Sequence, residues 1–429
     1  MSPRRNFVAL ISADIGSTLG SQISLVAIPW LVLTLTGSPT DLGLVAVAEM
    51  TPYLLTSTLL TPLADRYGLR ASSVCCDLLS AAATAGIAAF PHQGLGWLFV
   101  LVVLNGGLRG VGDRTKHVLL RPAAQAAGYP LIRVTSLYEG LSRLSTLFGA
   151  PLGGLLIVWA GARGAVWLDA ASFLLCAVLV ACAVSSPAPS ADPGAGRERY
   201  LTALRSGFDY LRQDRVLVTM LVTVFALNAL SYSATVVFLP VWARDVLHSP
   251  EALGLALGTF AAGALAGTLV FGVLAKRLPR YPTFLLGALL AGAPRLFTLG
   301  VSSNLPLVLV VSLVGGFGLA AVNPILGVAM YERIPDRLQA RVIGLCTTIA
   351  FTGVPIGGLL GGWAVSVFGL RPTLLAAAAL CLALNLAPLL GQRRLSLSLA
   401  ANGVPAPAAN GAPAPAANGA PAAAPAQPS

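Results

Sequence analysis

Ionisable side chains lie inside the long apolar stretches of this sequence, where they could carry protons or hold a polar substrate. A charge in an apolar interior is costly, so such residues usually face a cavity or a partner. Arg109 and Asp113 stand four residues apart, which in a helix places them on one face where they can pair directly. The full set of candidates for proton coupling or substrate binding is Asp14, Glu49, Arg109, Asp113, Glu139 and Asn228.

A carboxyl group can exchange protons in function only if its pKa lies near the ambient pH. Burial raises the pKa of a carboxyl group, and a neighbouring arginine lowers it. Asp14, Glu49 and Glu139 qualify by their depth in apolar stretches, and Glu49 is slightly favoured because it has no obvious partner on its own helix. Asp113 beside Arg109 could instead be a permanent ion pair. For each residue, an interhelical hydrogen bond or a loop anchor is an equally open interpretation.

A short charged turn interrupts the apolar sequence twice. The first copy, PLADRYGLR at 62–70, is followed 211 residues later by VLAKRLPR at 273–280. A glycine in the first copy tolerates the positive φ of a tight turn, and the acid can accept hydrogen bonds from arginine and from backbone amides. The residues expected to form this gating loop are Asp65, Arg66, Gly68, Arg70, Lys276 and Arg277. A generic charged turn that only orients the loop is the alternative interpretation.

The remaining polar residues support no further chemistry. Asp77 and Asp169 are expected to have structural roles, and Arg295 has no role that the sequence assigns. The two lysines, Lys116 and Lys276, do not follow glycine, which excludes a phosphate-binding Walker loop. The three histidines are scattered and the six cysteines form no C-x-x-C pair, so we expect no metal, no cofactor and no enzymatic activity.

Helices that cross a membrane must position these residues. The chain is 56% hydrophobic with a mean hydropathy of +0.80, and only 10% of its residues are charged, whereas soluble domains carry roughly 25%. An apolar run of about 20 residues can span a bilayer as a helix, and in lipid the backbone must satisfy its own hydrogen bonds. Twelve such runs are predicted, at 7–35, 41–64, 71–90, 95–112, 131–159, 164–184, 216–240, 251–275, 281–301, 305–330, 340–367 and 370–390.

Positive charge is distributed unequally between the two sides of the predicted helices. With both termini in the cytosol, nineteen lysines and arginines lie in cytosolic termini and loops, and only Arg163, Arg244 and Arg371 fall outside. This asymmetry follows the positive-inside rule. The net charge of +11 therefore reports topology, with anionic membrane lipids as the counter-charge, and does not indicate a nucleic-acid partner. We expect a monomeric multi-pass protein of the inner or plasma membrane.

The sequence contains two matched halves. A shift of 211 residues aligns the triplet Leu-Gly-Leu at 42–44 with that at 253–255, and a shift of 204 aligns GAPLGGLL with GVPIGGLL. Two repeats in parallel register are typical of secondary transporters, whose site lies between the halves. The predicted organisation is a six-helix bundle at 1–184, a cytosolic linker with an amphipathic helix at 185–215, a second six-helix bundle at 216–390 and a disordered cytosolic tail rich in Ala, Pro, Asn and Gly at 391–429.

Five motifs along the chain carry a resemblance to a known family. They are IPWLVLTLTGS at 28–38, TPLADRYGLR at 61–70, WLDAASF at 167–173, FDYLRQDRVL at 208–217 and ERIPDRLQARVIG at 332–344. In this order they resemble the major facilitator superfamily, in particular the branch with enterobactin exporters and macrolide efflux pumps. The resemblance implies an all-α membrane fold of twelve transmembrane helices in two pseudo-symmetric six-helix bundles. It also implies a gating loop that docks against the other half, although Thr61 stands where the family has glycine.

A further motif, GAPLGG at 149–154, resembles the antiporter motif of exporters, with the proline moved by one place to Pro151. Gly149, Gly153 and Gly154 allow another helix to come close; ordinary small-residue packing is the alternative. The resemblance implies a proton-coupled exporter, or antiporter, of an amphipathic small molecule such as a drug, antibiotic, siderophore or other secondary metabolite, working by alternating access. An uptake permease for a small metabolite is the alternative. A non-transporting membrane enzyme or sensor is less favoured, because no compact cluster of His, Cys or acidic residues is predicted at one membrane face.

Overall fold

Helix is the only regular secondary structure in the part of the chain that the computed structural model describes, which is residues 3–59, 68–90, 93–183, 208, 211–275, 277–334 and 336–390. The predicted tail at 391–429 and most of the predicted linker at 185–215 lie outside these residues. Two compact units divide the chain, Met1–Leu386 and Ala387–Ser429, and the first contains both sets of predicted membrane helices up to Leu386.

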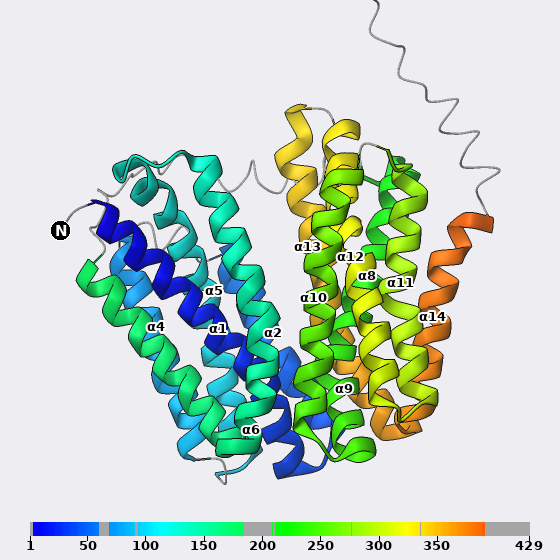
Figure 1. Ribbon diagram of the computed structural model, residues 1–429, viewed down its shortest axis with the longest axis horizontal. Helices are drawn as coiled ribbons and strands as arrows, with labels where there is room; N and C mark the ends of the chain where they lie inside the picture. Colours follow the sequence, from blue (N-terminus) through cyan, green and yellow to red (C-terminus); the bar gives the residue numbers. More distant parts are fainter. Residues whose placement is uncertain are drawn as a thin grey trace, which may run out of the picture. The chain divides into compact units, whose positions relative to one another are not determined.

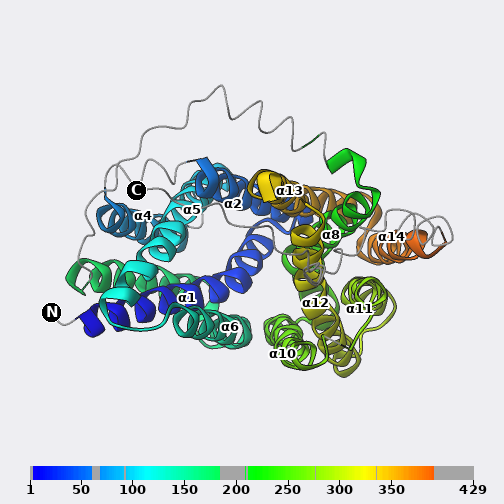
Figure 2. The ribbon, with the colours of Figure 1, turned by 90° about the horizontal axis from the view of Figure 1, so that it is seen from above.

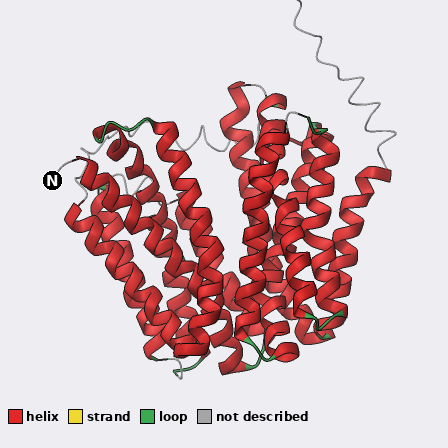
Figure 3. Ribbon diagram, viewed as in Figure 1, coloured by secondary structure: helices red, strands yellow, loops and turns green. Residues whose placement is uncertain are grey.

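The helices follow one another as long antiparallel rods (Figures 1 and 3). In chain order they are α1 (Pro3–Thr36), α2 (Pro39–Leu59), α4 (Leu69–Ala89), α5 (Leu95–Ala126), α6 (Leu131–Ala183), α8 (Arg215–Ser233), η1 (Ala234–Phe238), α9 (Leu239–Trp242), η2 (Ala243–Leu247), α10 (Pro250–Leu274), α11 (Arg280–Val301), α12 (Leu305–Arg333), α13 (Asp336–Phe368) and α14 (Leu370–Leu390).

Twelve membrane crossings fit these helices. Among the described residues, nine helices are long and apolar enough to cross a membrane, and the run from α8 to η2 counts as one of them. α6 is counted once but contains two helices, because Gly161 with φ 72° and ψ 166° breaks it near the middle. The 21 residues of α2 and the shorter apolar segment Leu370–Leu386 of α14 complete the twelve.

The length of α5 differs most from the predicted spans. The apolar run predicted at 95–112 continues as helix to Ala126, through Asp113 and Lys116. The helix continues because Lys116 is surrounded by carboxylates from other helices and is therefore stable inside the protein. A span predicted from hydropathy ends where charged residues begin, because hydropathy does not show whether other helices supply opposite charges for them.

The two halves are packed in the same way. α5 packs on α2 and α4, and α12 packs on α10 and α11; likewise α1 packs on α6, and α8 packs on α13 (Figure 2). At matching points a Cβ on Gly106 would meet the backbone of Glu49, and a Cβ on Gly316 would meet the backbone of Phe260. Glu49 and Phe260 are 211 residues apart, which is the shift that relates the repeated sequence motifs.

Glycine-rich faces bring the halves together. α2 packs on α13, and α10 packs on the first part of α6. A Cβ on Gly43 would lie 2.5 Å from the carbonyl oxygen of Gly358, and a Cβ on Gly254 would lie 2.7 Å from that of Ala150 and 3.1 Å from Gly154 Cα. The repeated Leu-Gly-Leu and Gly-Gly motifs therefore lie where the halves touch.

Candidate functional site

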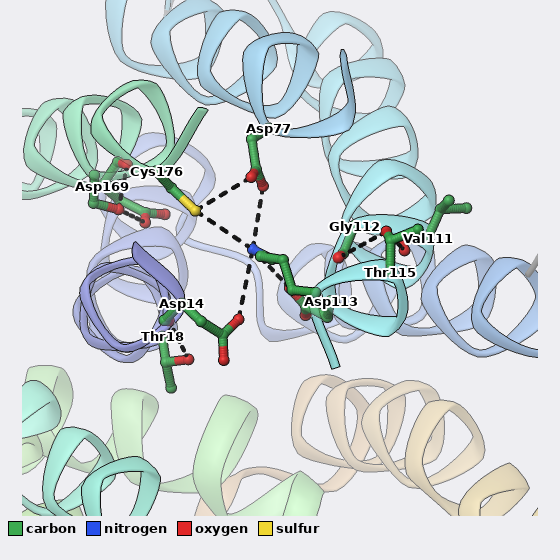
Figure 4. Close-up of polar contacts among 11 residues, drawn as sticks. Asp14, Thr18, Asp77, Val111, Gly112, Asp113, Thr115, Asp169 and Cys176 are labelled. Atoms are coloured by element: carbon green, nitrogen blue, oxygen red, sulfur yellow. Dashed lines mark hydrogen bonds and ion pairs between the residues drawn. The ribbon is translucent and has the colours of Figure 1, made fainter. Parts of the chain in front are cut away.

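A buried lysine lies at the centre of a charged cluster in the first half (Figure 4). Lys116 Nζ lies 3.2 Å from Asp77 Oδ1, 3.5 Å from Asp113 Oδ1 and 3.8 Å from Asp14 Oδ1. Lys116 is 2% exposed, and it joins α1, α4 and α5. We call these four residues the Lys116 cluster. Asp77, for which the sequence predicts a structural role, pairs with Lys116 in this cluster.

Neighbouring groups connect the Lys116 cluster to α6. The thiol of Cys176 donates a hydrogen bond to Asp77 Oδ2 at 3.2 Å, and the hydroxyl of Tyr138 donates one to Asp14. One ammonium group faces three carboxylates, and burial makes each unpaired charge costly. Chemically, the arrangement can hold exchangeable protons in addition to the lysine charge.

A second ion pair joins α5 to α2 in the same half. Arg109 Nη1 lies 3.0 Å from Glu49 Oε1 of α2, and the guanidinium group lies 5.9 Å from the centre of the Tyr53 ring. The predicted pairing of Arg109 with Asp113 is not the observed one, because Asp113 pairs with Lys116 on the next turn of α5. Glu49 has no partner on its own helix, as predicted, but it finds one on α5.

A cavity of about 530 Å³ lies between the halves. Its walls come from α2 and α5 of the first half and from α13 of the second. Hydroxyl groups alternate there with aliphatic and aromatic surface, and one arginine is present. The lining residues are Thr51, Tyr53, Leu54, Leu55, Ser57, Arg114, Thr347, Thr348, Phe351, Thr352 and Pro355. Tyr53 belongs both to this lining and to the surroundings of Arg109, so the cavity adjoins the Glu49–Arg109 pair.

Sequence reasoning missed two parts of this arrangement. The pairing role of Lys116 could have been suspected, because it is one of two lysines in the chain and shares a helical face with Arg109 and Asp113. Thr347 and Thr352 are polar positions in an otherwise apolar helix, but threonine is common in such helices and often bonds to its own backbone, as both do here. Their approach to α2 depends on the fold.

The antiporter-like motif lies where α6 is packed closely on two sides. A Cβ on Gly153 would lie 3.0 Å from a carbonyl oxygen of α1, and a Cβ on Gly154 would lie 2.9 Å from a carbonyl oxygen of α10. Gly149 contacts α1 and Pro151 contacts α10 in the same way. The motif therefore lies at the contact between halves, and its link to export remains a prediction.

The gating loop is described only in part. Gly68 has φ 90°, the positive value predicted for it, and directly precedes α4. Arg70 donates a hydrogen bond to the carbonyl oxygen of Ala181 near the end of α6. Arg277 is exposed. The members outside the described residues are Asp65, Arg66 and Lys276.

Two other predicted residues link helices. Asn228 Nδ2 donates to the carbonyl oxygen of Ala350 at 2.9 Å and so joins α8 to α13. Asp169 accepts a hydrogen bond from Ser24 at 2.5 Å, which agrees with the structural role expected of it. The side chain of Glu139 lies outside the described residues. A substrate role for Asn228 stays a prediction.

Two polar contacts join the halves at the end of α2 opposite the gating loop. Arg244 Nη1 donates to the carbonyl oxygen of Leu33 at 2.8 Å, and Thr40 Oγ1 donates to Ser366 Oγ at 2.7 Å. We call these the closing contacts. The carbonyl oxygen of Leu33, in the last turn of α1, also accepts a hydrogen bond from the backbone N–H of Gly37 at 3.0 Å, so Arg244 is its second donor.

The chain is similar to known transporters along most of its length. The model of the Major Facilitator Superfamily matches residues 10–250 and 221–418. The chain is 30% identical over 378 residues to the multidrug efflux pump Tap of Mycobacterium tuberculosis, covering 86% of this chain and 89% of that protein. Tap of Mycolicibacterium fortuitum is 27% identical over 404 residues, with 93% and 98% covered. The crystal structure of the nucleoside transporter NupG is similar in fold, with a TM-score of 0.75 at 12% identity over 89% of this chain and 98% of that one.

Proposed function

The chain belongs to the major facilitator superfamily, and we propose that it exports amphipathic organic compounds from the cell. It is a secondary transporter, a multi-pass membrane protein that moves a small molecule and is not an enzyme. Relatives named multidrug efflux pumps support drugs and antibiotics as the substrate class. Siderophores and other secondary metabolites share the same mixture of apolar and polar surface.

The cavity between the halves is the observation that carries this proposal. It is formed by α2, α5 and α13, so a molecule bound there touches both halves at once. Leu55, Phe351 and Pro355 offer apolar surface, while Thr348 and Arg114 offer hydrogen bonds. Binding sites for organic molecules combine a mostly apolar lining with a few polar groups in this way. An amphipathic compound fits such a lining better than a sugar or an ion does.

The closing contacts supply the complementary part of an alternating-access cycle. They hold the halves together at one end of the cavity through Arg244 and Thr40. We propose that this is the outward end, and that the cavity opens toward the cytosolic gating loop. Moving the substrate outward then requires these two contacts to break and the gating loop to dock, as the halves rotate about their glycine-rich contacts.

Proton coupling is proposed to reside in the Lys116 cluster. Asp14, Asp77 and Asp113 surround one ammonium group, and all but Asp113 are buried. A proton that enters this cluster changes the balance between lysine and carboxylates, and so changes how firmly α1, α4 and α5 are held together. The Glu49–Arg109 pair lies beside the cavity and is proposed to sense the substrate.

The exposed surface of the helices supports a location in a lipid bilayer. Large apolar side chains are exposed along the helices, with Trp159 at 81% and Val273 at 82%, which suits contact with lipid acyl chains. We propose that both termini lie in the cytosol, that the membrane is the inner or plasma membrane, and that the working unit is a monomer. The excess of cytosolic arginine supports this orientation.

Inside-out membrane vesicles test export and coupling together. A proton-coupled exporter should concentrate a fluorescent lipophilic dye in the vesicle lumen when the lumen is made acidic, since protons leave as dye enters. Nigericin, which collapses the pH gradient, should abolish this accumulation. Vesicles from cells without the gene are the control. Dye release under the same gradient would indicate an uptake permease. Dye accumulation that nigericin does not reduce would contradict proton coupling.

A further inference from the structure

Arg295 is a buried cation for which the second half of the chain supplies no counter-charge. It lies on α11, is 3% exposed, and its Nε and Nη2 atoms have no hydrogen-bond partner among the described residues. The sequence contains no Asp or Glu between Glu251 and Glu332, and none from 337 to the end of α14. Arginine stays charged in proteins and is costly in a membrane interior unless it is paired. Among the described residues no carboxylate pairs with Arg295, which leaves its charge available to a partner from outside the chain.

Ser312 is a second unpartnered polar group, and the helix register places it opposite Arg295. α11 and α12 run antiparallel, joined by residues 302–304. A Cβ on Gly287 would lie 2.6 Å from the Gly318 carbonyl oxygen, and one turn further a Cβ on Gly315 would lie 3.5 Å from that of Ala291. The next turn brings position 295 to position 312. Ser312 is fully buried, and its hydroxyl has no partner in the described part of the chain.

The pseudo-symmetry of the halves supplies no acidic partner for Arg295. In the first half, Glu49 of α2 pairs with Arg109 of α5, whereas Arg295 lies on α11, the counterpart of α4. The residue equivalent to Glu49 in the second half is Phe260, and its ring centre lies 4.8 Å from the Arg295 guanidinium carbon. An aromatic face attracts a cation, but it offers no lone pair to the free N–H groups. Arg295 therefore keeps unused donors that an anion could accept.

The helices around Arg295 are packed closely. A Cβ on Gly316 would meet the backbone of Phe260, so α10 and α12 are nearly in backbone contact beside the site. α11 and α12 are equally close at Gly287, and the Phe260 ring covers another side. Figure 2 shows the three helices grouped side by side. This packing favours a monatomic ion over an organic acid.

We propose that Arg295 and Ser312 form a buried anion site that holds chloride between α10, α11 and α12. Arg295 supplies the charge and two N–H donors, and Ser312 supplies a hydroxyl donor. The ion stabilises the second half by neutralising its buried arginine. This inference stands apart from the export function, because the site lies within one half and shares no residue with the cavity between the halves.

Thermal unfolding of the purified full-length protein tests the proposal. Replacing gluconate with chloride at constant ionic strength should raise the melting temperature by roughly one to a few degrees once chloride exceeds its dissociation constant. Arg295→Met should abolish this rise. Ser312→Ala should raise the half-effective chloride concentration by roughly tenfold, since one hydrogen bond to the ion is lost. Arg280→Gln removes an exposed arginine that is paired with Glu332, and it should respond like the wild type.

Several outcomes would overturn the site. If chloride still raises the melting temperature of Arg295→Met, the ion binds elsewhere. If the wild type has the same melting temperature in chloride and in gluconate, the protein binds no stabilising chloride. If Arg295→Met yields no folded protein, crystals of the wild type grown with bromide decide the question. An anomalous peak beside Arg295 and Ser312 supports the proposal, and the lack of one contradicts it.

Discussion

At the residue scale, Lys116 is held by carboxylates from three helices, so its charge and theirs depend on one another. Lys116 and Asp77 are both nearly free of solvent contact, at 3.2 Å from each other. Because water cannot replace a lost partner there, removing one member of such a pair costs more than the pair contributes. The carboxylates are thus sensitive to any change in the lysine, which is what a coupling site requires.

Lys116→Met should lower the free energy of unfolding by about 3–5 kcal/mol, because it leaves buried carboxylates without a cation. Adding Asp77→Asn to Lys116→Met should recover part of that loss, since one of the stranded charges is then removed. Asp113→Asn is the matched control: its side chain is 36% exposed, so the expected cost is within about 1 kcal/mol. Chemical unfolding in detergent measures all three. Equal stability of the single and double variants would show that the charges are not coupled.

Glu49→Gln should affect transport more than stability. The pair with Arg109 lies beside the cavity and is partly solvent-accessible, with both side chains less than one-fifth exposed. Glutamine can still accept the hydrogen bond from Arg109, but it removes the negative charge that strengthens this bond. Hydrogen bonds to charged groups contribute about 1.5–3 kcal/mol, so the transport rate should fall by up to roughly ten- to hundredfold if the pair acts during the cycle. Dye transport in vesicles gives the rate. A normal rate with a large fall in melting temperature would assign the pair a structural role only.

Residue pairing is the level at which the sequence is least informative. The spacing of Arg109 and Asp113 correctly places both on one face of α5, but their partners come from α2 and from the next turn. Glu49, Asp14 and Asp77 reach α5 from helices that are neighbours only after folding. A single sequence shows which residues share a helical face, but it does not show which helices pack against that face. The candidate residues could therefore be predicted, and their ion-pair partners could not.

At the scale of helices, glycine determines which pairs of rods can approach. Gly154 of α6 and Gly254 of α10 face each other across the contact between halves: a Cβ on Gly154 would lie 3.2 Å from Gly254 Cα. Small residues replace side-chain layers with backbone contact in membrane bundles. If the halves rotate relative to each other during transport, this contact must slide or rotate as well. It therefore both holds the halves together and serves as the axis of their movement.

Gly154→Leu should reduce transport strongly while each half still folds. The added side chain cannot be accommodated at this contact without moving the halves apart, and overpacking of this kind costs about 1–3 kcal/mol. Gly140→Leu on the same helix is the control, because a Cβ on Gly140 meets no atom within 4 Å. Vesicle transport and the amount of protein in the membrane are measured for both variants. Equal transport by the two would contradict the role of this contact.

Helix positions were largely predictable because lipid enforces them. An apolar run of about 20 residues in lipid has no alternative to helix that satisfies its backbone hydrogen bonds, so the predicted spans coincide with helices from α1 to α14. The exceptions have local causes. Charges inside α5 made it appear shorter than it is, and the break of α6 at Gly161 depends on one glycine with positive φ between two spans.

At the scale of the whole transporter, the unit Met1–Leu386 has its halves joined at one end and a cavity between them. Sequence repetition predicted the two halves, since the 211-residue shift relates Gly43 to Gly254 and Glu49 to Phe260. It could not predict which end is closed, because this depends on Arg244, Thr40 and Ser366, none of which belongs to a repeated motif. The proposed cycle requires these contacts to open and close.

A reversible cross-link between Thr40→Cys and Ser366→Cys shows whether the halves separate at this end during transport. The two hydroxyl oxygens are 2.7 Å apart, so cysteines at these positions are well placed to form a disulfide. The exposed native cysteines Cys75 and Cys182 would first be replaced with serine. If the halves must separate here for export, oxidation should stop dye transport and a reducing agent should restore it, while each single-cysteine variant stays active. Undiminished transport by the cross-linked protein would contradict the proposed movement.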